Sequence, residues 1–334
     1  MKIALFYSSA TINNYGGQKV QGRMWKEGLE ALGHSVDLIS PFNVYEWNSY
    51  DRFIILGIGN LVYDYVQLLK RFGQAQLVSA PIIDWPKSIR SFRMRAKYIG
   101  CQRLKIHKPL NDYYVCRNEF SSFLVRSEHE KLFLTEGLGV NENRVHLVPI
   151  SLRFSTSEIT PIDFGQKDNF CLHVSRLASY EKNVSRLILA AKKYKFNLVL
   201  AGTINGAQEQ RWLDDQICNS SNIQYVGRLS DKELNDYYRR AKVFALPSLI
   251  EGVGMVALEA AVQGAEIVLT NLGAPKEYYD GRAFLVNPLD VDEIGKAVCS
   301  ALESGKSQPE LREFILKNYS FERCSQMLSD VLKS

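Results

Sequence analysis

The sequence lacks three features that would each point to a specialised class of protein. It has no apolar run of the roughly 18–20 residues that a membrane span needs, because the uncharged stretch 3–18 is broken by Ser, Asn and Gly. The apolar segment 3–7 is too short for the core of a secretory signal peptide, and no clear cleavage site follows it. Repeats and low-complexity tracts are also missing. We therefore expect a globular, cytoplasmic protein.

Metal-binding patterns are missing as well. The six cysteines are scattered without a CxxC pair, which is typical of reduced thiols and gives no zinc site. The five histidines show no metal-ligand spacing, although His107 closes a basic stretch and is the histidine most worth testing. The net charge is small as well. The chain has 41 Lys and Arg residues and 36 Asp and Glu residues, and the resulting net charge of +5 does not by itself imply a nucleic-acid partner.

What is present is a regular alternation of apolar runs and helical patterns along 334 residues. Because a single core stops growing near ~250–300 residues, we expect two domains. Continuous apolar strands that alternate with helices predict parallel sheets with helices on both faces, and so an α/β fold of two doubly wound domains. Strands are predicted at 2–7, 35–40, 52–56, 76–80, 123–125, 145–149, 170–174, 197–201, 223–226, 243–246, 266–270 and 283–286. Helices are predicted at 18–32, 128–136, 183–193, 207–218, 231–241, 255–263, 291–302, 308–318 and 321–332.

The domain boundaries follow from a stretch with little periodicity. Residues 151–167 hold Ser, Thr, Pro and Gly and are interpreted as a linker. We expect an N-terminal Rossmann-like domain at 1–150, a C-terminal domain at 168–307, and two C-terminal helices at 308–334 that follow the last strand. A cleft between two such domains is the usual place for a ligand.

The strongest chemical signal lies at 246–260, where a strand, a glycine-containing turn and a helix follow one another. Backbone N–H groups at a helix N-terminus favour an anion, and Gly252 and Gly254 allow a ligand to approach the backbone. Glu251 lies in the loop and Glu259 about two turns along the helix. We expect these carboxylates to contact different parts of one long ligand.

This stretch resembles the E-x7-E motif of retaining glycosyltransferases of the kind grouped in glycosyltransferase family 4. The likeness continues through four further segments: His173-Val174-Ser175-Arg176-Leu177, Glu181-Lys182-Asn183, Leu200-Ala201-Gly202 and Tyr225-Val226-Gly227-Arg228-Leu229. The resemblance implies the GT-B architecture, in which two Rossmann-like domains face a central cleft. It also implies transfer of a sugar from a UDP-sugar or GDP-sugar to a saccharide or lipid-linked acceptor. Surface polysaccharide, lipopolysaccharide or glycolipid assembly in bacteria is the role it suggests.

The resemblance assigns roles to residues that match the family's motifs. Arg176 and Lys182 would bind the diphosphate, Glu251 the donor sugar, and Glu259 the ribose hydroxyls. We therefore take Arg176, Lys182 and Glu251 as catalytic, with the two cations in place of a metal, and expect no cofactor. The remaining donor-binding candidates are Gly16, Gly17, Gly227, Arg228, Gly252, Val253 and Gly254. The sequence departs from the family's pattern at Ser175, where glycine is usual, and at Val253, where phenylalanine is frequent.

Two other patterns invite a functional interpretation. Asp290-Val291-Asp292 has the form of a metal–nucleotide DxD motif, but it precedes a helix, so we interpret Asp290 as the N-cap. The segment 56–60 is similar to a dinucleotide fingerprint, but the third glycine position holds Val62, so we assign no nicotinamide cofactor.

Residues 87–108 contain eight cations and no acid, with apolar side chains between them. This basic stretch has three interpretations: a solvated face, a contact with an anionic membrane that carries the acceptor, or a contact with another polyanion. For the membrane contact we expect Phe92, Met94 and Tyr98 to enter the interface. Two alternatives to the main hypothesis remain. One is a sugar-nucleotide epimerase on the same fold, and the other is a nucleic-acid-directed glycosyltransferase that uses the basic stretch.

Overall fold

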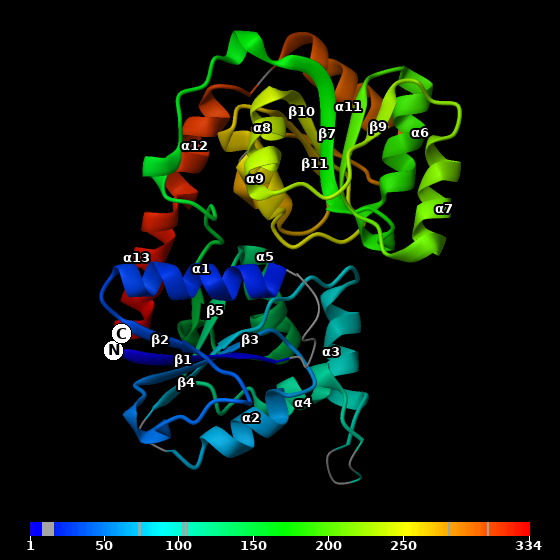
Figure 1. Ribbon diagram of the computed structural model, residues 1–334. Coiled ribbons are helices and arrows are strands. Elements are labelled where there is room, and N and C mark those ends of the chain that lie inside the picture. The colour runs from blue at the N-terminus through cyan, green and yellow to red at the C-terminus, as the bar shows by residue number, and fades with distance from the viewer. Residues whose placement is uncertain (9–16, 73–74, 102–103, 105, 280, 306) are drawn as a thin grey trace. The chain divides into compact units, whose positions relative to one another are not determined.

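The computed structural model describes residues 1–8, 17–72, 75–101, 104, 106–279, 281–305 and 307–334. The chain divides into two compact units (Figure 1). The first comprises Met1–Ser155 and Tyr319–Ser334, and the second comprises Thr156–Asn318. Each unit is built on a parallel six-stranded sheet, which confirms the predicted fold of two Rossmann-like α/β domains.

In the first unit the strand order is β2-β1-β3-β4-β5-β6. Alternate side chains of β1 pack on opposite faces, with Ile3 and Leu5 in one core and Ala4 and Phe6 in the other. Helices α1 and α13 cover one face, and α2 and α4 cover the other (Figure 1). The strands are β1 (Lys2–Tyr7), β2 (Ser35–Leu38), β3 (Arg52–Leu56), β4 (Gln76–Ala80), β5 (Ser122–Val125) and β6 (Val145–Leu147). The helices are α1 (Gly17–Ala31), α2 (Val62–Leu69), α3 (Ile89–Tyr98), α4 (Pro109–Cys116), α5 (Glu128–Leu132) and α13 (Phe321–Lys333), with short turns η1 (Trp47–Ser49), η3 (Phe133–Gly137) and η4 (Glu142–Arg144).

In the second unit the order is β12-β11-β10-β7-β8-β9. Helices α6, α7 and α11 pack on one face of this sheet, and α8 and α9 lie on the other (Figure 1). The strands are β7 (Asp168–Arg176), β8 (Leu198–Thr203), β9 (Ile223–Tyr225), β10 (Ala241–Leu246), β11 (Glu266–Thr270) and β12 (Phe284–Val286). The helices are α6 (Val184–Tyr194), α7 (Gly206–Ile217), α8 (Asp231–Arg240), α9 (Met255–Val262), α10 (Pro275–Tyr279), α11 (Val291–Ser304) and α12 (Glu310–Tyr319), with turns η5 (Thr156–Glu158), η6 (Phe164–Gln166) and η7 (Tyr180–Lys182).

The last helix belongs to the first unit, although it follows the second unit in the sequence. Gly28 of α1 lies so close to α13 that a Cβ atom at this position would be 2.0 Å from Ser325 Oγ. His34 and Ser329 are hydrogen bonded through Nε2 and Oγ at 2.8 Å. The sequence-based division placed both C-terminal helices in one segment after the second domain, whereas the structure assigns α12 almost entirely to the second unit and α13 to the first.

The basic stretch contains a helix that the sequence patterns did not predict, α3, and it ends at Lys108, the N-cap of α4. Helix α3 begins at the N-cap Ser88, whose side chain accepts a hydrogen bond from the Ser91 N–H at 3.3 Å. Phe92 and Ala96 are its buried residues, four positions apart. The expectation that Phe92 enters a membrane interface is therefore wrong, since its side chain is 2% exposed and packs in the core.

Among the described residues, no helix combines the length and the apolar character that crossing a membrane requires.

Candidate active site

The carboxyl ends of β7 and β10 mark the place where a ligand is expected in the second unit. These strands are neighbours, and the chain proceeds outward from β7 to β8 and β9 on one side and from β10 to β11 and β12 on the other. Ligands of open α/β sheets bind at such a switch point, outside the carboxyl ends of the strands. Arg176 is the last residue of β7, and the segments that follow β7 and β10 carry Lys182 and Glu251, respectively.

Lys182 and Glu251 meet at this switch point although they are 69 residues apart. Lys182 Nζ donates to Glu251 Oε2 at 2.8 Å, and the Ser248 hydroxyl donates to the same oxygen at 2.9 Å. The two side chains are 29% and 11% exposed, respectively. The structure thus brings together two of the three residues that the sequence analysis proposed as catalytic.

Asn183 fixes the backbone beside Lys182. Its φ of 57° is left-handed, a conformation that asparagine tolerates better than most residues. The buried side chain donates from Nδ2 to the carbonyl of Pro247 at 2.9 Å and to that of Pro288 at 2.6 Å. These bonds join the end of η7 to the loop that carries Glu251. The sequence analysis quoted Asn183 as part of a motif but assigned it no role.

Arg176 lies at the end of β7 and is exposed. Its Nη2 donates to Ser179 Oγ at 3.1 Å, and the Ser179 hydroxyl in turn donates to Glu181. The hydrogen bond from Ser179 lowers the pKa of Glu181. Within the described part of the chain, Arg176 makes no ion pair with Glu251, the carboxylate that Lys182 binds.

The loop after β10 ends in a backbone conformation that favours glycine. Gly254 has a φ of 75° and is the N-cap of α9, and its carbonyl accepts from the Ala257 N–H at 2.8 Å. Val253 is buried and Gly252 is half-buried in the turn before it. Glu259 lies on α9 and is 2% exposed. The predicted carboxylates therefore occupy different environments, one at the edge of the loop and one inside the helix packing.

The remaining predicted donor-binding residues are placed as follows. Gly227 has a φ of 77°, and its carbonyl accepts from the Gly202 N–H at 2.8 Å. Arg228 beside it is exposed. Gly17 begins α1 in the first unit, and Gly16 lies outside the described residues.

His173 lies on β7, close to the carboxyl end of the strand, and is fully buried. Its Nδ1 is 2.8 Å from the carbonyl oxygen of Ala245 on β10, so this nitrogen carries the proton. Nε2 therefore accepts from the Ser175 hydroxyl, at 2.7 Å. Burial lowers the pKa of His173 to about 4, and the ring is neutral at pH 7. The Ser175 carbonyl also explains Gly202, because a Cβ atom there would lie 1.7 Å from it.

The interpretation of Asp290 as an N-cap is confirmed. Its Oδ1 accepts from the backbone N–H groups of Asp292 and Glu293 at 2.8 and 3.1 Å, at the start of α11. Asp292 pairs with Lys193 at 2.5 Å. The described residues contain no group of three or more His, Cys, Asp or Glu side chains that could hold a metal ion.

Residues 156–318, the whole second unit, match the family model of glycosyl transferases group 1. The second unit is a group 1 glycosyl transferase domain. The resemblance to GT-B glycosyltransferases of the family 4 kind is thereby confirmed, while retention and the roles of the motif residues stay predictions. The Lys182–Glu251 pair and the loops that hold it therefore belong to this group 1 domain.

Curated relatives of the group 1 domain carry related names. An uncharacterized glycosyltransferase of Methanocaldococcus jannaschii is 26% identical over 70% of this chain and 58% of its own length. The O-antigen chain mannosyltransferase B of Escherichia coli is 26% identical over 46% of this chain and 42% of its own. The MMP alpha-(1->4)-mannosyltransferase of Mycolicibacterium hassiacum is 30% identical over 49% and 41%. The chain thus spans between 41 and 58% of the length of these relatives.

Solved structures share the fold over the full chain. Sucrose-phosphate synthase of Thermosynechococcus elongatus has a TM-score of 0.78 at 16% identity, and the match covers 100% of this chain and 98% of that one. HepE of Anabaena, in complex with UDP and glucose, has a TM-score of 0.71 at 14% identity, with 100% and 99% covered. At these identities the likeness shows the GT-B fold.

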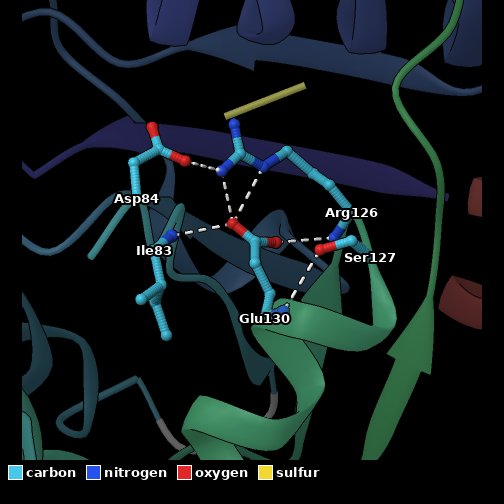
Figure 2. Close-up of polar contacts among 5 residues, drawn as sticks. All are labelled: Ile83, Asp84, Arg126, Ser127 and Glu130. Carbon is cyan, nitrogen blue, oxygen red and sulfur yellow. Dashed lines mark hydrogen bonds and ion pairs between the residues drawn. The ribbon is translucent and has the colours of Figure 1, made fainter. Parts of the chain in front are cut away.

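The first unit holds a charged network around the buried Glu130 that the sequence analysis missed (Figure 2). Arg126, after β5, donates from Nη2 to Asp84 Oδ1 at 2.6 Å and from Nε to Glu130 Oε1 at 2.9 Å. Burial acts to lower the pKa of Arg126, but Asp84 and Glu130 outweigh it and hold the pKa above its usual value. The Glu130 oxygens also accept from the backbone N–H groups of Ile83 and Arg126, both at 2.7 Å. Arg126 and Asp84 are 42 residues apart, so no local sequence pattern indicates this network.

The glycines of the segment 56–60 have a structural explanation. Gly57 has a φ of 84°, and a Cβ atom at Gly59 would lie 2.1 Å from the Ser8 carbonyl oxygen. Both glycines therefore allow the ends of β1 and β3 to approach each other. His107 pairs with Asp112 at 3.1 Å.

Proposed function

We propose that the chain is a glycosyltransferase that moves a hexose from a UDP-sugar or GDP-sugar to an acceptor hydroxyl, with retention at the anomeric carbon. The observation that carries the proposal is the Lys182–Glu251 pair at the switch point of a group 1 domain. An ammonium group and a carboxylate side by side suit a diphosphate and the hydroxyls of a sugar, respectively. The UDP and glucose named for HepE support this donor class.

The residues divide the work as follows. Lys182 and Arg176 offset the negative charge that grows on the leaving diphosphate, together with the N-terminus of α9. Glu251 accepts hydrogen bonds from the donor sugar, and Glu259 from the ribose. Because Lys182 is bonded to Glu251 in the described structure, donor binding requires this cation to be shared with, or transferred to, the diphosphate. The charge stabilisation is thus assigned to side chains rather than to a metal.

The proposed reaction is a front-side substitution at the anomeric carbon. The bond from this carbon to the diphosphate oxygen breaks, and the bond to the acceptor oxygen forms on the same face. The acceptor proton passes to an oxygen of the leaving diphosphate, so no protein base is needed. Charge stabilisation of the kind assigned to Lys182 is usually the largest contribution to such a step.

A role in bacterial surface polysaccharide, lipopolysaccharide or glycolipid assembly is the corresponding cellular proposal, with the protein in the cytoplasm. The name of the Escherichia coli relative, an O-antigen chain mannosyltransferase, supports it. The names of the relatives favour neither the epimerase nor the nucleic-acid-directed alternative.

Contact with the inner face of a membrane belongs to the same proposal. Lys87, Arg90, Arg93 and Lys97 are exposed on and beside α3, where Met94 and Tyr98 are 52% and 70% exposed. Each basic residue near an anionic membrane contributes about 1 kcal/mol, so several together hold a protein there reversibly. Arg103 and Lys105 of the basic stretch lie outside the described residues.

The direct test is nucleotide binding by the full chain. In a thermal-shift assay with UDP, GDP and ADP, a ligand at 100 times its Kd adds about 2.7 kcal/mol of apparent stability. We expect stabilisation by UDP or GDP that persists in EDTA. No stabilisation by any of the three would count against the proposed function, and a loss in EDTA that manganese restores would remove the metal-independent mechanism.

A further inference from the structure

A cavity of about 290 Å³ lies entirely within the first unit. Its wall is mostly apolar and includes Ile83, Trp85 and Leu110. Three charged side chains also line it, Asp84, Arg95 and Lys108. An apolar cavity with a few convergent polar groups is the usual form of a small-molecule site.

The loop that forms one wall is held in an unusual conformation. Ile82 has a φ of 55°, which is rare for a β-branched residue and persists only where the surroundings impose it. The surroundings here are the charged network: Glu130 binds the Ile83 N–H and Arg126 binds Asp84 (Figure 2). The cavity wall is therefore built in advance of any ligand.

Two of the three charged side chains that line the cavity are cations, and both are also exposed. Asp84 is paired with Arg126, which does not line the cavity. Arg95 lies over the Trp85 ring, 5.6 Å from its centroid. In the described part of the chain neither Arg95 nor Lys108 forms an ion pair with an acidic side chain, so two cations remain to be matched by a ligand.

One apolar side chain of the cavity wall also reaches the surface. Ile99 lines the cavity and is also 44% exposed. Met94 and Tyr98, on the helix that ends just before Ile99, and Leu104 are 52%, 70% and 71% exposed. A ligand whose apolar part is longer than the cavity would extend along this surface.

We infer that the cavity binds a lipid phosphate, with the apolar chain against Ile83 and Trp85 and the phosphate between Arg95 and Lys108. A phosphate carries up to two negative charges, which suits two unmatched cations. The apolar wall and the apolar surface beyond Ile99 favour a chain over a free anion. Resting on the proposed function, this names the acceptor class as a lipid phosphate and places its anionic end in the first unit.

The test measures binding of butyl, hexyl and octyl phosphate to the full chain by calorimetry, with inorganic phosphate and uncharged octyl glucoside as comparisons. Affinity is expected to rise by up to about fourfold for each added CH2 group until the cavity is full. The double variant Arg95→Gln/Lys108→Gln is expected to bind octyl phosphate at least about tenfold more weakly. The matched control is Arg90→Gln/Lys97→Gln, which removes two exposed cations of the same stretch that do not line the cavity, and it should change the affinity less than about threefold.

The inference would be overturned if inorganic phosphate bound as tightly as octyl phosphate, or if octyl glucoside did. It would also be overturned if the two double variants lost the same affinity for octyl phosphate. UDP and GDP binding is measured on the same samples and should be the same in both variants and in the unchanged chain. A failure of all three samples to bind UDP or GDP counts against the proposed function alone. The octyl phosphate comparison decides the cavity assignment, so the two failures are distinguishable.

Discussion

Asn183 offers a quantitative test of how the loops of the group 1 domain are held. Replacement by Asp preserves the size of the side chain and its tolerance of the left-handed φ, but it removes the Nδ2 donor from two buried carbonyls, those of Pro247 and Pro288. A buried polar group without its partner costs about 1–3 kcal/mol, so the loss of the donor to both carbonyls should lower the free energy of unfolding of Asn183→Asp by about 2–6 kcal/mol. Because Asn183 is adjacent to Lys182, UDP or GDP affinity should fall as well.

The chain supplies a matched control at Asn219. It has a nearly identical φ of 58° and is exposed, and its side chain forms no hydrogen bond with any residue that the structure describes. Asn219→Asp should therefore change the stability by less than about 0.5 kcal/mol. Urea unfolding of both variants and of the unchanged chain gives the difference. Equal stabilities for Asn183→Asp and Asn219→Asp would refute the conclusion that Asn183 holds the site together.

Three further predictions concern the carboxylates, the buried histidine and the basic stretch. Glu251→Ala should reduce turnover more than nucleotide affinity, whereas Glu259→Gln, which keeps the volume at a buried position, should weaken nucleotide binding; equal effects on UDP or GDP affinity would contradict this division of roles. The pKa of His173 is about 4 in the folded chain and near 6.5 when unfolded, so its contribution is complete above pH 6.5 and is lost as the pH falls towards 4. This loss is about 2–3 kcal/mol by pH 4.5, and His173→Asn should abolish it in urea unfolding at pH 7 and 4.5; an unchanged pH dependence would show that His173 is not responsible. The quadruple change of Arg90, Arg93, Arg95 and Lys97 to Gln should release the protein from anionic liposomes in a flotation assay; retained liposome binding with lost duplex binding would instead support a nucleic-acid contact.

The sequence predicted the sheets well because their strands are continuous apolar runs. In β11 all five residues are buried, and its predicted bounds are those of the structure. The helix α3 was missed because four cations surround its two buried positions, Phe92 and Ala96, which leaves a weak apolar stripe. Packing of α13 on the first unit was also out of reach, since it depends on contacts such as His34 with Ser329, 295 residues apart.

The site was predicted in part. The motifs located Lys182 and Glu251 but not their direct contact. Since Lys182 is 29% exposed and bonded to a carboxylate that is 11% exposed, its removal should cost about 1 kcal/mol of stability in addition to its effect on function. No pattern in the sequence indicated the cavity of the first unit, because the cavity forms only when the loop at Ile82 packs beside α3.

The measurement that tests the central claim most directly compares Lys182→Ala with Lys232→Ala, an exposed lysine on α8 outside the site. Isothermal titration of UDP and GDP in EDTA gives the affinity, and transfer from the corresponding nucleotide sugars gives the turnover. Removal of one preorganised charge stabiliser should reduce the turnover of Lys182→Ala by roughly 10²–10³-fold and weaken nucleoside diphosphate binding, while Lys232→Ala remains like the unchanged chain. Equal turnover and equal affinity in the two variants would contradict the assignment of the donor site to the Lys182–Glu251 pair.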